Sequence, residues 1–565
     1  MIADFRIHMK QITPFFLSFV FCLAGFAQEI ISPLDIPLYL SGNFGELRSN
    51  HFHSGIDFKT KGVTGLPIKS VQDGYVSRIN VSPYGYGNAI YINHPDGTTT
   101  VYAHLENFAP HFESLIRENQ YLQETFALTL YFEPDELPVK QGEKIGTGGN
   151  SGGSGGPHLH FEIRETEGDI PMDPLPYFKD KIKDTRPPEI RGLKIFPQHN
   201  QGIVNGETKN LPITLIKDKS GKQQINRKIA AWGEIGIGIK AYDRMSETTN
   251  IYGVHEIILN VDGEEVYHSV MGKFSFGDTR YLNSYIDWDS WDIGGEFYMK
   301  SFVDPGNRLK FNQSSSNGII LIDQEKDYLF EYILKDVYGN TTTLKFVITG
   351  KISKIPILPE PEDWELIYNL GNTYFDKGIE LEIPRGNLYT NYSIAVDTIS
   401  AHTPFSPLYK IGERIPLHSY CPLTLNITSD TYRDKTKYGV VYNRNTSRSW
   451  LGGEYESGKM NVKIRELGDF SIEIDTIPPV IRPHNETNWT AGKRISFKIT
   501  DNLSGIASYK GTLNGRFVLF EYDAKTNSLY CKYDPKRMQR GEQTLILTVD
   551  DSAGNRSELV RQIVW

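Results

Sequence analysis

Residues 149–162 read GNSGGSGGPHLHFE, a glycine-rich loop followed by alternating polar and apolar residues. In a β-strand successive side chains point to opposite faces. His158, His160 and Glu162 therefore share one face, while the apolar residues between them share the other. One face can pack on a core while the other carries polar chemistry. This stretch predicts a strand with two histidines and a glutamate on its polar face.

A second motif, HSGID, occupies residues 53–57. Its polar ends, His53 and Asp57, are four residues apart, which places them on one face if this segment is a strand. Gly55 between them leaves space above the sheet.

A third motif, YAHL, occupies residues 102–105 and includes His104. The turn residues Pro95-Asp96-Gly97 predict a hairpin between strands 89–93 and 98–105. Within the second strand, Thr100, Tyr102 and His104 are expected to share a face. We therefore expect the strands of all three motifs to present polar residues to one groove.

These motifs suit a catalytic zinc site. Catalytic zinc takes three ligands from His and Asp or Glu and keeps one position open. Cysteine is absent from the three motifs, which argues against a structural zinc cluster. A single His-x-His pair arises easily by chance, but five acid/base residues within three motifs of one glycine-rich domain do not.

The three motifs, in this order, resemble the lysostaphin/LytM-type zinc metallopeptidases, which hydrolyse peptide bonds in peptidoglycan. The resemblance covers about residues 45–175 and includes the segments 65–76, 85–94 and 139–146 between the motifs.

Matching the family pattern residue by residue implies one Zn²⁺ ion held by His53, Asp57 and His160. The resemblance implies that His158 is the general base. It implies that His104, when protonated, positions water or stabilises the oxyanion. Which of the two histidines accepts the proton stays open. Glu162 is interpreted as support for a ligand histidine.

The sequence departs from the family pattern in two places. Residues 109–138 are longer than the usual connection after the hairpin, and helical spacing over 112–123 predicts a helical insertion that forms a cap or groove wall. Gly156 stands where relatives often have threonine, a change that removes no ligand.

The N-terminus is typical of an exported protein. Basic residues precede an apolar run over 15–26, so we interpret residues 1–27 as a cleaved signal peptide. No later segment is long and apolar enough to span a membrane. We therefore expect localisation in the periplasm or cell envelope.

Length and composition predict several β-rich domains. The chain has 565 residues, with 51 Gly, 30 Pro and 12% aromatic residues. The net charge of −9 argues against a nucleic-acid partner. After the signal peptide only Cys421 and Cys531 remain, and we expect both to be buried free thiols.

An internal repeat organises the rest of the chain. A segment DTRPPEI at 184–190 recurs as DTIPPVI at 475–481, and Asp-x-x-Gly-Asn occurs at both 336–340 and 551–555. The segments that these motifs flank resemble bacterial immunoglobulin-like domains. The expected fold is mainly β, with a glycine-rich antiparallel peptidase domain, a short helical insertion and three β-sandwich-like modules. The expected boundaries are a peptidase domain at 30–178, immunoglobulin-like sandwiches at 184–350 and 475–565, and an unassigned β-rich module at 355–474.

Three functions are compatible with this organisation. The first is zinc-dependent hydrolysis of peptide cross-links in peptidoglycan. The second is a non-catalytic LytM-like regulator of other wall hydrolases, which would be marked by a missing ligand, whereas here the set is complete. The third is an envelope adhesin or carbohydrate-binding protein, with an envelope protein as a possible partner of the C-terminal modules.

Overall fold

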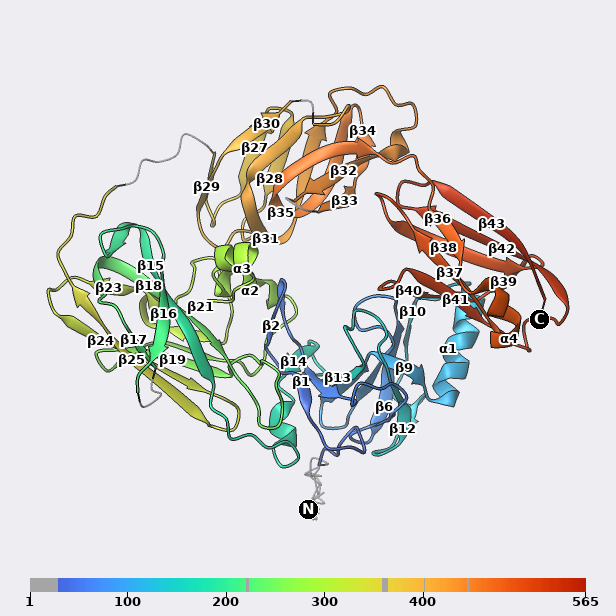
Figure 1. The fold of residues 1–565 in the computed structure, drawn as a ribbon, viewed down its shortest axis with the longest axis horizontal. Coiled ribbons are helices and arrows are strands. Elements are labelled where there is room, and N and C mark those ends of the chain that lie inside the picture. Colours follow the sequence, from blue (N-terminus) through green and yellow to red (C-terminus); the bar gives the residue numbers. More distant parts are fainter. Residues whose placement is uncertain (1–28, 220–222, 358–363, 401, 445–446, 565) are drawn as a thin grey trace, which may run out of the picture.

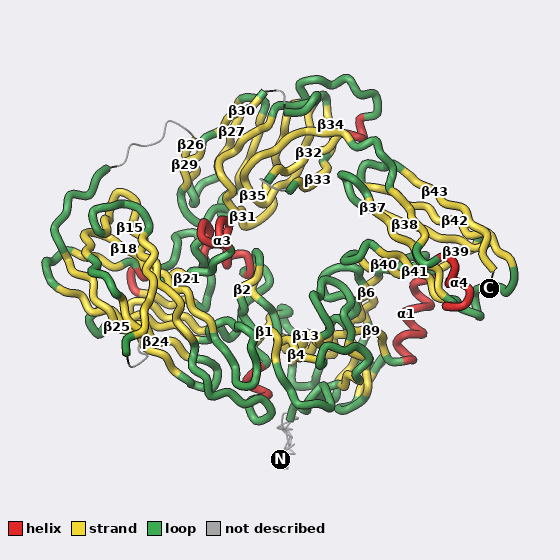
Figure 2. Tube along the Cα trace, in the orientation of Figure 1, coloured by secondary structure: helices red, strands yellow, loops and turns green. Residues whose placement is uncertain are grey.

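The computed structural model describes residues 29–219, 223–357, 364–400, 402–444 and 447–564, and strands dominate them (Figure 2). The expected signal peptide at 1–27 lies outside the described residues. Four groups of strands follow one another around a ring in Figure 1, coloured from blue through green and orange to red. The structure confirms the mainly β fold class, with an N-terminal β domain followed by β modules.

The first group contains an antiparallel sheet built around the strand that carries the histidine pair. From one edge its strands are β1 (Leu40–Gly42), β4 (Ile56–Lys59), β13 (His158–Glu165), β8 (Thr98–Ala103), β7 (Ala89–Asn93), β6 (Gly74–Val81) and β10 (Leu128–Tyr131), with β11 (Pro138–Val139) paired to β6 and β14 (Ile170–Met172) paired to β13. Strand β13 thus has β4 on one side and β8 on the other.

The alternation predicted for β13 is confirmed. Leu159, Phe161 and Ile163 are fully buried in the hydrophobic core, where Phe161 packs edge-on against Tyr102 and Phe178. Burial of such large apolar side chains contributes roughly 1.5–3 kcal/mol each. The core thereby fixes the orientation of the polar face.

A smaller sheet and a helix complete the first group. The sheet contains β5 (Pro67–Lys69), β12 (Lys144–Gly148) and β9 (Leu105–Phe108), while β2 (Leu47–Arg48) pairs with β3 (His51–Phe52). The predicted helical insertion is α1 (Pro110–Leu122), which follows β9 and buries Phe112 and Ile116. The proline at its first position suits a helix start, because its missing N–H would have no partner there.

The second group forms an eleven-stranded sheet. Its main path is β17 (Gln223–Ile225), β16 (Leu211–Lys217), β15 (Glu189–Val204), β18 (Ala230–Tyr242), β25 (Thr341–Gly350), β24 (Asp327–Lys335), β19 (Glu256–Val261), β20 (Glu264–Val270) and β22 (Asn312–Ser314), with β21 (Met299–Lys300) and β23 (Ile320–Ile322) paired to β18. Two short helices, α2 (Leu282–Tyr285) and α3 (Trp288–Gly294), lie between β20 and β21. The buried side chains of this group and of the first form one continuous hydrophobic cluster.

The third group contains β26 (Trp364–Leu366) paired with β29 (Tyr392–Ile394), and a larger sheet. The strands of that sheet are β27 (Asn372–Asp376), β28 (Ile379–Ile383), β31 (Leu408–Asn426), β35 (Lys459–Ile474), β32 (Tyr438–Asn443) and β33 (Arg448–Gly452), with β30 (Val396–Ile399) paired to β31 and β34 (Glu454–Glu456) paired to β35.

The fourth group is a sandwich of two four-stranded sheets around one core. One sheet is β36 (Val480–Pro483), β37 (Arg494–Thr500), β41 (Ser528–Lys532) and β40 (Glu521–Asp523), and the other is β39 (Arg516–Val518), β38 (Ile506–Leu513), β42 (Glu542–Asp551) and β43 (Arg556–Val564). A short helix, α4 (Trp489–Gly492), precedes β37. Cys421 in the third group and Cys531 in this one are buried free thiols, as expected.

Contacts between the last group and the helical insertion close the ring, and Figure 1 shows β40 and β41 beside β10 and α1. Arg117 of α1 lies 3.7 Å from Glu521, and Tyr121 packs edge-on against Phe517. Lys510 pairs with Glu124 just after the helix. The insertion therefore forms the docking surface for the C-terminal sandwich.

Candidate active site

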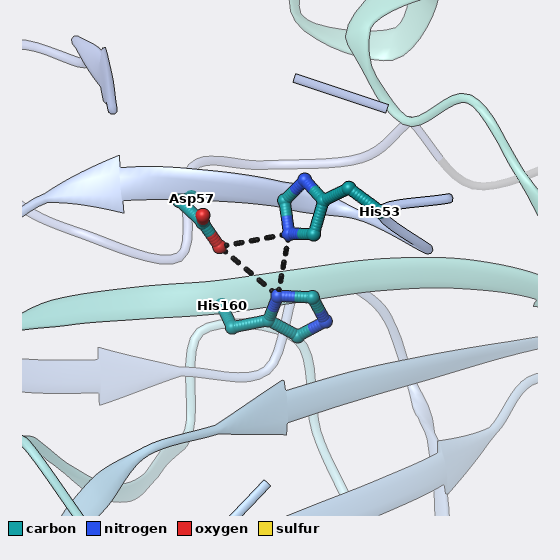
Figure 3. Close-up of side chains that lie close together, drawn as sticks. All are labelled: His53, Asp57 and His160. Carbon is teal, nitrogen blue, oxygen red and sulfur yellow. Dashed lines mark hydrogen bonds and ion pairs between the residues drawn. The ribbon is translucent and has the colours of Figure 1, made fainter. Parts of the chain in front are cut away.

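Three side chains from two neighbouring strands and the loop before them converge on one point (Figure 3). His53 Nε2 lies 3.1 Å from Asp57 Oδ1, and His160 Nδ1 lies 3.0 Å from both of these atoms. Asp57 on β4 and His160 on β13 are direct cross-strand partners. His53 was expected on the same strand as Asp57, but it lies in the loop between β3 and β4 and reaches Asp57 from there.

This triad fits a metal ion. Its residues expose only 7%, 6% and 5% of their surface, for His53, Asp57 and His160 respectively. Ligands that each lie ~2.1 Å from a tetrahedral zinc stand about 3.4 Å apart, close to the separations seen here. The two nitrogens and one carboxylate oxygen are the donor types of catalytic zinc sites. The structure thus contains a group able to hold a metal ion.

Both histidines of the triad are oriented through their second ring nitrogen. His53 Nδ1 lies 2.7 Å from the carbonyl oxygen of Asn43, and His160 Nε2 lies 2.7 Å from Glu162 Oε1. These contacts place the ring N–H away from the triad and leave the other nitrogen free to bind a metal. The interpretation of Glu162 as support for a histidine agrees with this contact.

Glu162 is the hub of a buried polar network. Ser54 and Tyr86 donate hydroxyl hydrogen bonds to its Oε1, at 2.7 and 2.6 Å. Arg164, two residues farther along the same strand face, donates to its Oε2. Burial alone would raise the pKa of Glu162, but the charge of Arg164 and the hydrogen bond to His160 hold it far below its usual range. The carboxylate is therefore ionised at neutral pH.

Charge coupling also determines the protonation of the triad itself. Burial would raise the pKa of Asp57, yet the charge on His53 and hydrogen bonds from His158, His160 and His53 lower it well below its usual value. Burial would lower the pKa of His160, yet Asp57 and Glu162 raise it to about 9. A metal at this position would take the place of the proton on His160.

His158 lies at the edge of the triad. Its Nε2 is 3.5 Å from Asp57 Oδ1, while its Nδ1 is 2.8 Å from the carbonyl oxygen of Gly156 and 3.1 Å from Ser154 Oγ. The glycine-rich loop thus holds the outer nitrogen and directs the inner one to the site.

His104 reaches the site in a way that the sequence did not predict. The expected strand 98–105 ends at Ala103, and His104 adopts a positive φ of 59° between β8 and β9. Thr100 and Tyr102 share a face as expected, and their hydroxyls hydrogen-bond to each other, but His104 does not lie on that face. Tyr102 points into the core, where its hydroxyl accepts hydrogen bonds from the Val71 amide and the Thr100 hydroxyl.

This break after β8 brings His104 next to His158 and His160. Its ring centroid lies 4.8 Å from that of His158 and 5.9 Å from that of His160. Burial, reinforced by His160 and His158, lowers the pKa of His104 to about 3. Its Nδ1 lies 2.9 Å from the carbonyl oxygen of Ser151. The resting ring is therefore neutral at neutral pH, and its N–H is directed at the Ser151 carbonyl.

Sequence reasoning missed two residues that contact the triad. The carbonyl oxygen of Asn43 accepts a hydrogen bond from His53 Nδ1. Arg48 Nη2 donates a hydrogen bond to Asp57 Oδ2 at 3.3 Å. Neither follows a periodic pattern with the ligands, so the sequence carried no signal for them. Arg164 continues the two-residue period of His160 and Glu162, and that period was a usable signal.

Comparison with known proteins gives two matches within this chain. Residues 51–126 and 133–174 match peptidase family M23. The N-terminal domain is a LytM-type peptidase domain of family M23. Residues 365–475, for which the sequence predicted only an unassigned β-rich module, match the Zu5-like domain, which is a β module.

Curated relatives match the M23 domain. DD-carboxypeptidase/endopeptidase Mpg of Neisseria meningitidis is 33% identical over 118 residues, which cover 21% of this chain and 21% of the relative. Peptidoglycan DD-endopeptidase ShyB of Vibrio cholerae is 33% identical over 111 residues, which cover 20% of each protein. Cell division protein DipM of Caulobacter vibrioides is 28% identical over 145 residues, which cover 26% of this chain and 18% of the relative. The match thus spans about a fifth of each relative's length.

Proposed function

We propose that this protein is a zinc-dependent endopeptidase that hydrolyses peptide cross-links of peptidoglycan. The observation that carries the proposal is the buried His53, Asp57 and His160 triad, whose ligand atoms stand 3.0–3.1 Å apart with two further histidines beside it. The M23 match and the peptidoglycan DD-endopeptidase among the relatives support the same substrate class.

In this proposal His53, Asp57 and His160 hold one Zn²⁺ ion. Zinc supplies Lewis-acid chemistry there: it polarises the scissile carbonyl group and acidifies water. Glu162 and Asn43 keep the two histidine rings in the tautomers that ligation requires.

His158 is proposed as the general base. Its Nδ1 is held by the Gly156 carbonyl, so its Nε2 accepts the proton of the attacking water and passes it to the leaving amine. His104, neutral at rest, positions water through its remaining nitrogen. Because His158 and His104 both lie beside the triad, an experiment is needed to assign the two roles.

We also propose the setting of this activity. The expected signal peptide and the envelope enzymes among the relatives support export to the periplasm or cell envelope. None of the helices in the described part of the chain is long and apolar enough to cross a membrane. We keep the expected units 30–178, 184–350, 355–474 and 475–565 as proposed domains, and the last three as candidate contacts for an envelope protein.

Digestion of defined cross-linked muropeptides, with products identified by mass spectrometry, tests the proposal. The zinc-loaded full chain should cleave the cross-link, whereas His160→Ala should lose zinc and activity together. His51→Ala is the matched control, because His51 is exposed and its Nδ1 lies 2.8 Å from the Ser49 carbonyl, outside the triad. Full activity of His160→Ala would contradict the proposal. Inactivity of a wild-type chain that binds zinc would favour the alternative function, a non-catalytic LytM-like regulator of other wall hydrolases.

A further inference from the structure

A second set of acidic residues meets in the second group of strands, away from the peptidase triad. Asp184 precedes β15, Asp243 directly follows β18, and Asp336 directly follows β24. One carboxylate oxygen from each lies within 4.8 Å of the others. The three residues expose only 8%, 3% and 5% of their surface. Three carboxylates are therefore buried together.

The protein itself leaves this cluster incompletely paired. Asp184 Oδ2 and Asp243 Oδ1 are buried and have no hydrogen-bond partner among the described residues. Within the same part of the chain, no lysine or arginine forms an ion pair with any of the three carboxylates. Burial, then the charges of Asp336 and Asp184, raise the pKa of Asp243 to about 8. Unpaired buried carboxylates are costly, so these two oxygens point to a missing positive partner.

The same cluster recurs in the C-terminal sandwich. Asp475, Asp501 and Asp551 also bring one carboxylate oxygen each within 4.8 Å of the others. Asp501 Oδ1 again has no hydrogen-bond partner in the described chain.

The hydrogen bonds around the two clusters correspond as well. The Asn340 side chain donates to Asp336 and to the Asp184 carbonyl, and Asn555 donates in the same way to Asp551 and the Asp475 carbonyl. The repeat DTxPP and Asp-x-x-Gly-Asn motifs therefore build one arrangement twice.

The donor chemistry selects a hard cation. The clusters offer carboxylate oxygens and contain no histidine or cysteine, which disfavours zinc and other softer ions. Ca²⁺ binds oxygens at about 2.3–2.6 Å, so two ligands of one ion stand at most ~5 Å apart, as these do. We propose that Asp184, Asp243 and Asp336 bind one Ca²⁺ ion and that Asp475, Asp501 and Asp551 bind a second.

A series of backbone and side-chain hydrogen bonds links the first site to the peptidase triad. Asp243 and Tyr252 exchange backbone hydrogen bonds of 2.9 and 3.0 Å. The next residue, Gly253, forms two hydrogen bonds with the Asn43 side chain, at 2.8 and 2.9 Å. The carbonyl oxygen of Asn43 in turn holds His53. A cation bound at Asp243 therefore orders residues 243–253. Gly253 in this segment holds Asn43, which in turn holds His53.

The second site lies at the joint between the third and fourth groups. The amide of Asp475 donates to the Lys437 carbonyl, and Lys437 Nζ donates to the carbonyl of Ala553 at 2.8 Å. Both proposed ions thus stabilise junctions of the ring rather than the centre of a module.

Calorimetric titration of the full chain with CaCl₂, after exhaustive dialysis against calcium-free buffer, tests the proposal. We expect two Ca²⁺ per chain, one in Asp243→Asn and one in Asp501→Asn. The control Glu325→Gln makes the same carboxylate-to-amide change at an exposed position of the second group and should keep two. No saturable uptake by the wild type, or two ions in Asp243→Asn, would overturn the proposal.

A second measurement does not depend on the variants folding well. In the wild type, Ca²⁺ should slow amide hydrogen exchange in residues 243–253 and raise the temperature of unfolding, and equal concentrations of Mg²⁺ should do so less. His160→Ala should respond to Ca²⁺ as the wild type does, because the proposed sites lie outside the zinc triad. Stronger protection by Mg²⁺ than by Ca²⁺, or no change in the 243–253 segment, would contradict the assignment.

Discussion

Glu162 is the residue on which the orientation of His160 depends, since its Oε1 lies 2.7 Å from the His160 Nε2 atom. Replacing it with glutamine keeps the shape but removes the charge that fixes the ring tautomer. We expect Glu162→Gln to lower zinc affinity about 10–100-fold with all three ligands intact. Competition with a chromogenic chelator measures this. Glu165→Gln, the same change on the same strand outside the network, should leave affinity unchanged, and equal losses in both variants would refute the role.

Asp173 gives a pH dependence that is independent of the metal triad. Burial raises its pKa from 3.8 to about 7, so the folded state prefers the protonated carboxyl. The resulting destabilisation is absent at low pH, grows as pH rises above 3.8, and levels off above about 7. Asp173→Asn should therefore stabilise the protein by about 2–3 kcal/mol more at pH 8 than at pH 5. Thermal unfolding at both pH values measures this, and an equal gain at both would contradict it.

The residues of the triad were predictable, but the path of His104 was not. The motifs around His53, Asp57 and His160 carry strong local signals, and the structure brings these residues together. The positive φ of His104 arises because β8 and β9 belong to different sheets, which is a tertiary constraint. A neutral His104 likewise follows from burial that a sequence pattern does not reveal.

At the scale of elements, the spacing between β4 and β13 sets the distance between Asp57 and His160. A Cβ at Gly55 would lie 2.3 Å from the Phe161 carbonyl oxygen and 2.7 Å from Glu162 Cγ. Gly55→Ala should therefore push the strands apart, cost ~1–3 kcal/mol of stability and weaken zinc binding.

Gly155→Ala is the matched control for that change, because a Cβ there meets nothing within 4 Å. Zinc titration and thermal unfolding compare the two variants. If both bind zinc like the wild type, strand spacing does not control the site.

The elements were predicted unevenly. The helical spacing at 112–123 predicted α1 (Pro110–Leu122), and the repeat motifs predicted β modules in the second and fourth groups. The partner of α1 could not be predicted, because Arg117 and Tyr121 find theirs in residues about four hundred positions later. A local pattern identifies an amphipathic helix but not the distant surface that covers it.

At the scale of the whole molecule, the C-terminal sandwich touches the peptidase domain close to the candidate active site. Lys525 donates to the carbonyl of Asn150, the residue before Ser151, whose carbonyl contacts His104. Arg537 lies over the Tyr121 ring, 4.0 Å from its centroid. The last module is therefore placed to brace the glycine-rich loop.

Reversing two charges should open this ring. Arg117→Glu with Lys510→Glu places like charges opposite Glu521 and Glu124, so small-angle X-ray scattering should show a larger radius of gyration. The control Lys310→Glu with Arg385→Glu makes the same charge change at exposed positions of other groups and should keep the wild-type radius. An unchanged radius in the first variant would mean that these ion pairs do not hold the ring closed.

The central claim is that His53, Asp57 and His160 bind zinc. Diffraction from crystals of the zinc-loaded full chain, collected on both sides of the zinc absorption edge, tests it most directly. The claim predicts the strongest anomalous peak between His53 Nε2, Asp57 Oδ1 and His160 Nδ1, and its disappearance in His160→Ala. A strongest zinc peak held by other residues, or no peak at the triad of a zinc-loaded crystal, would contradict it.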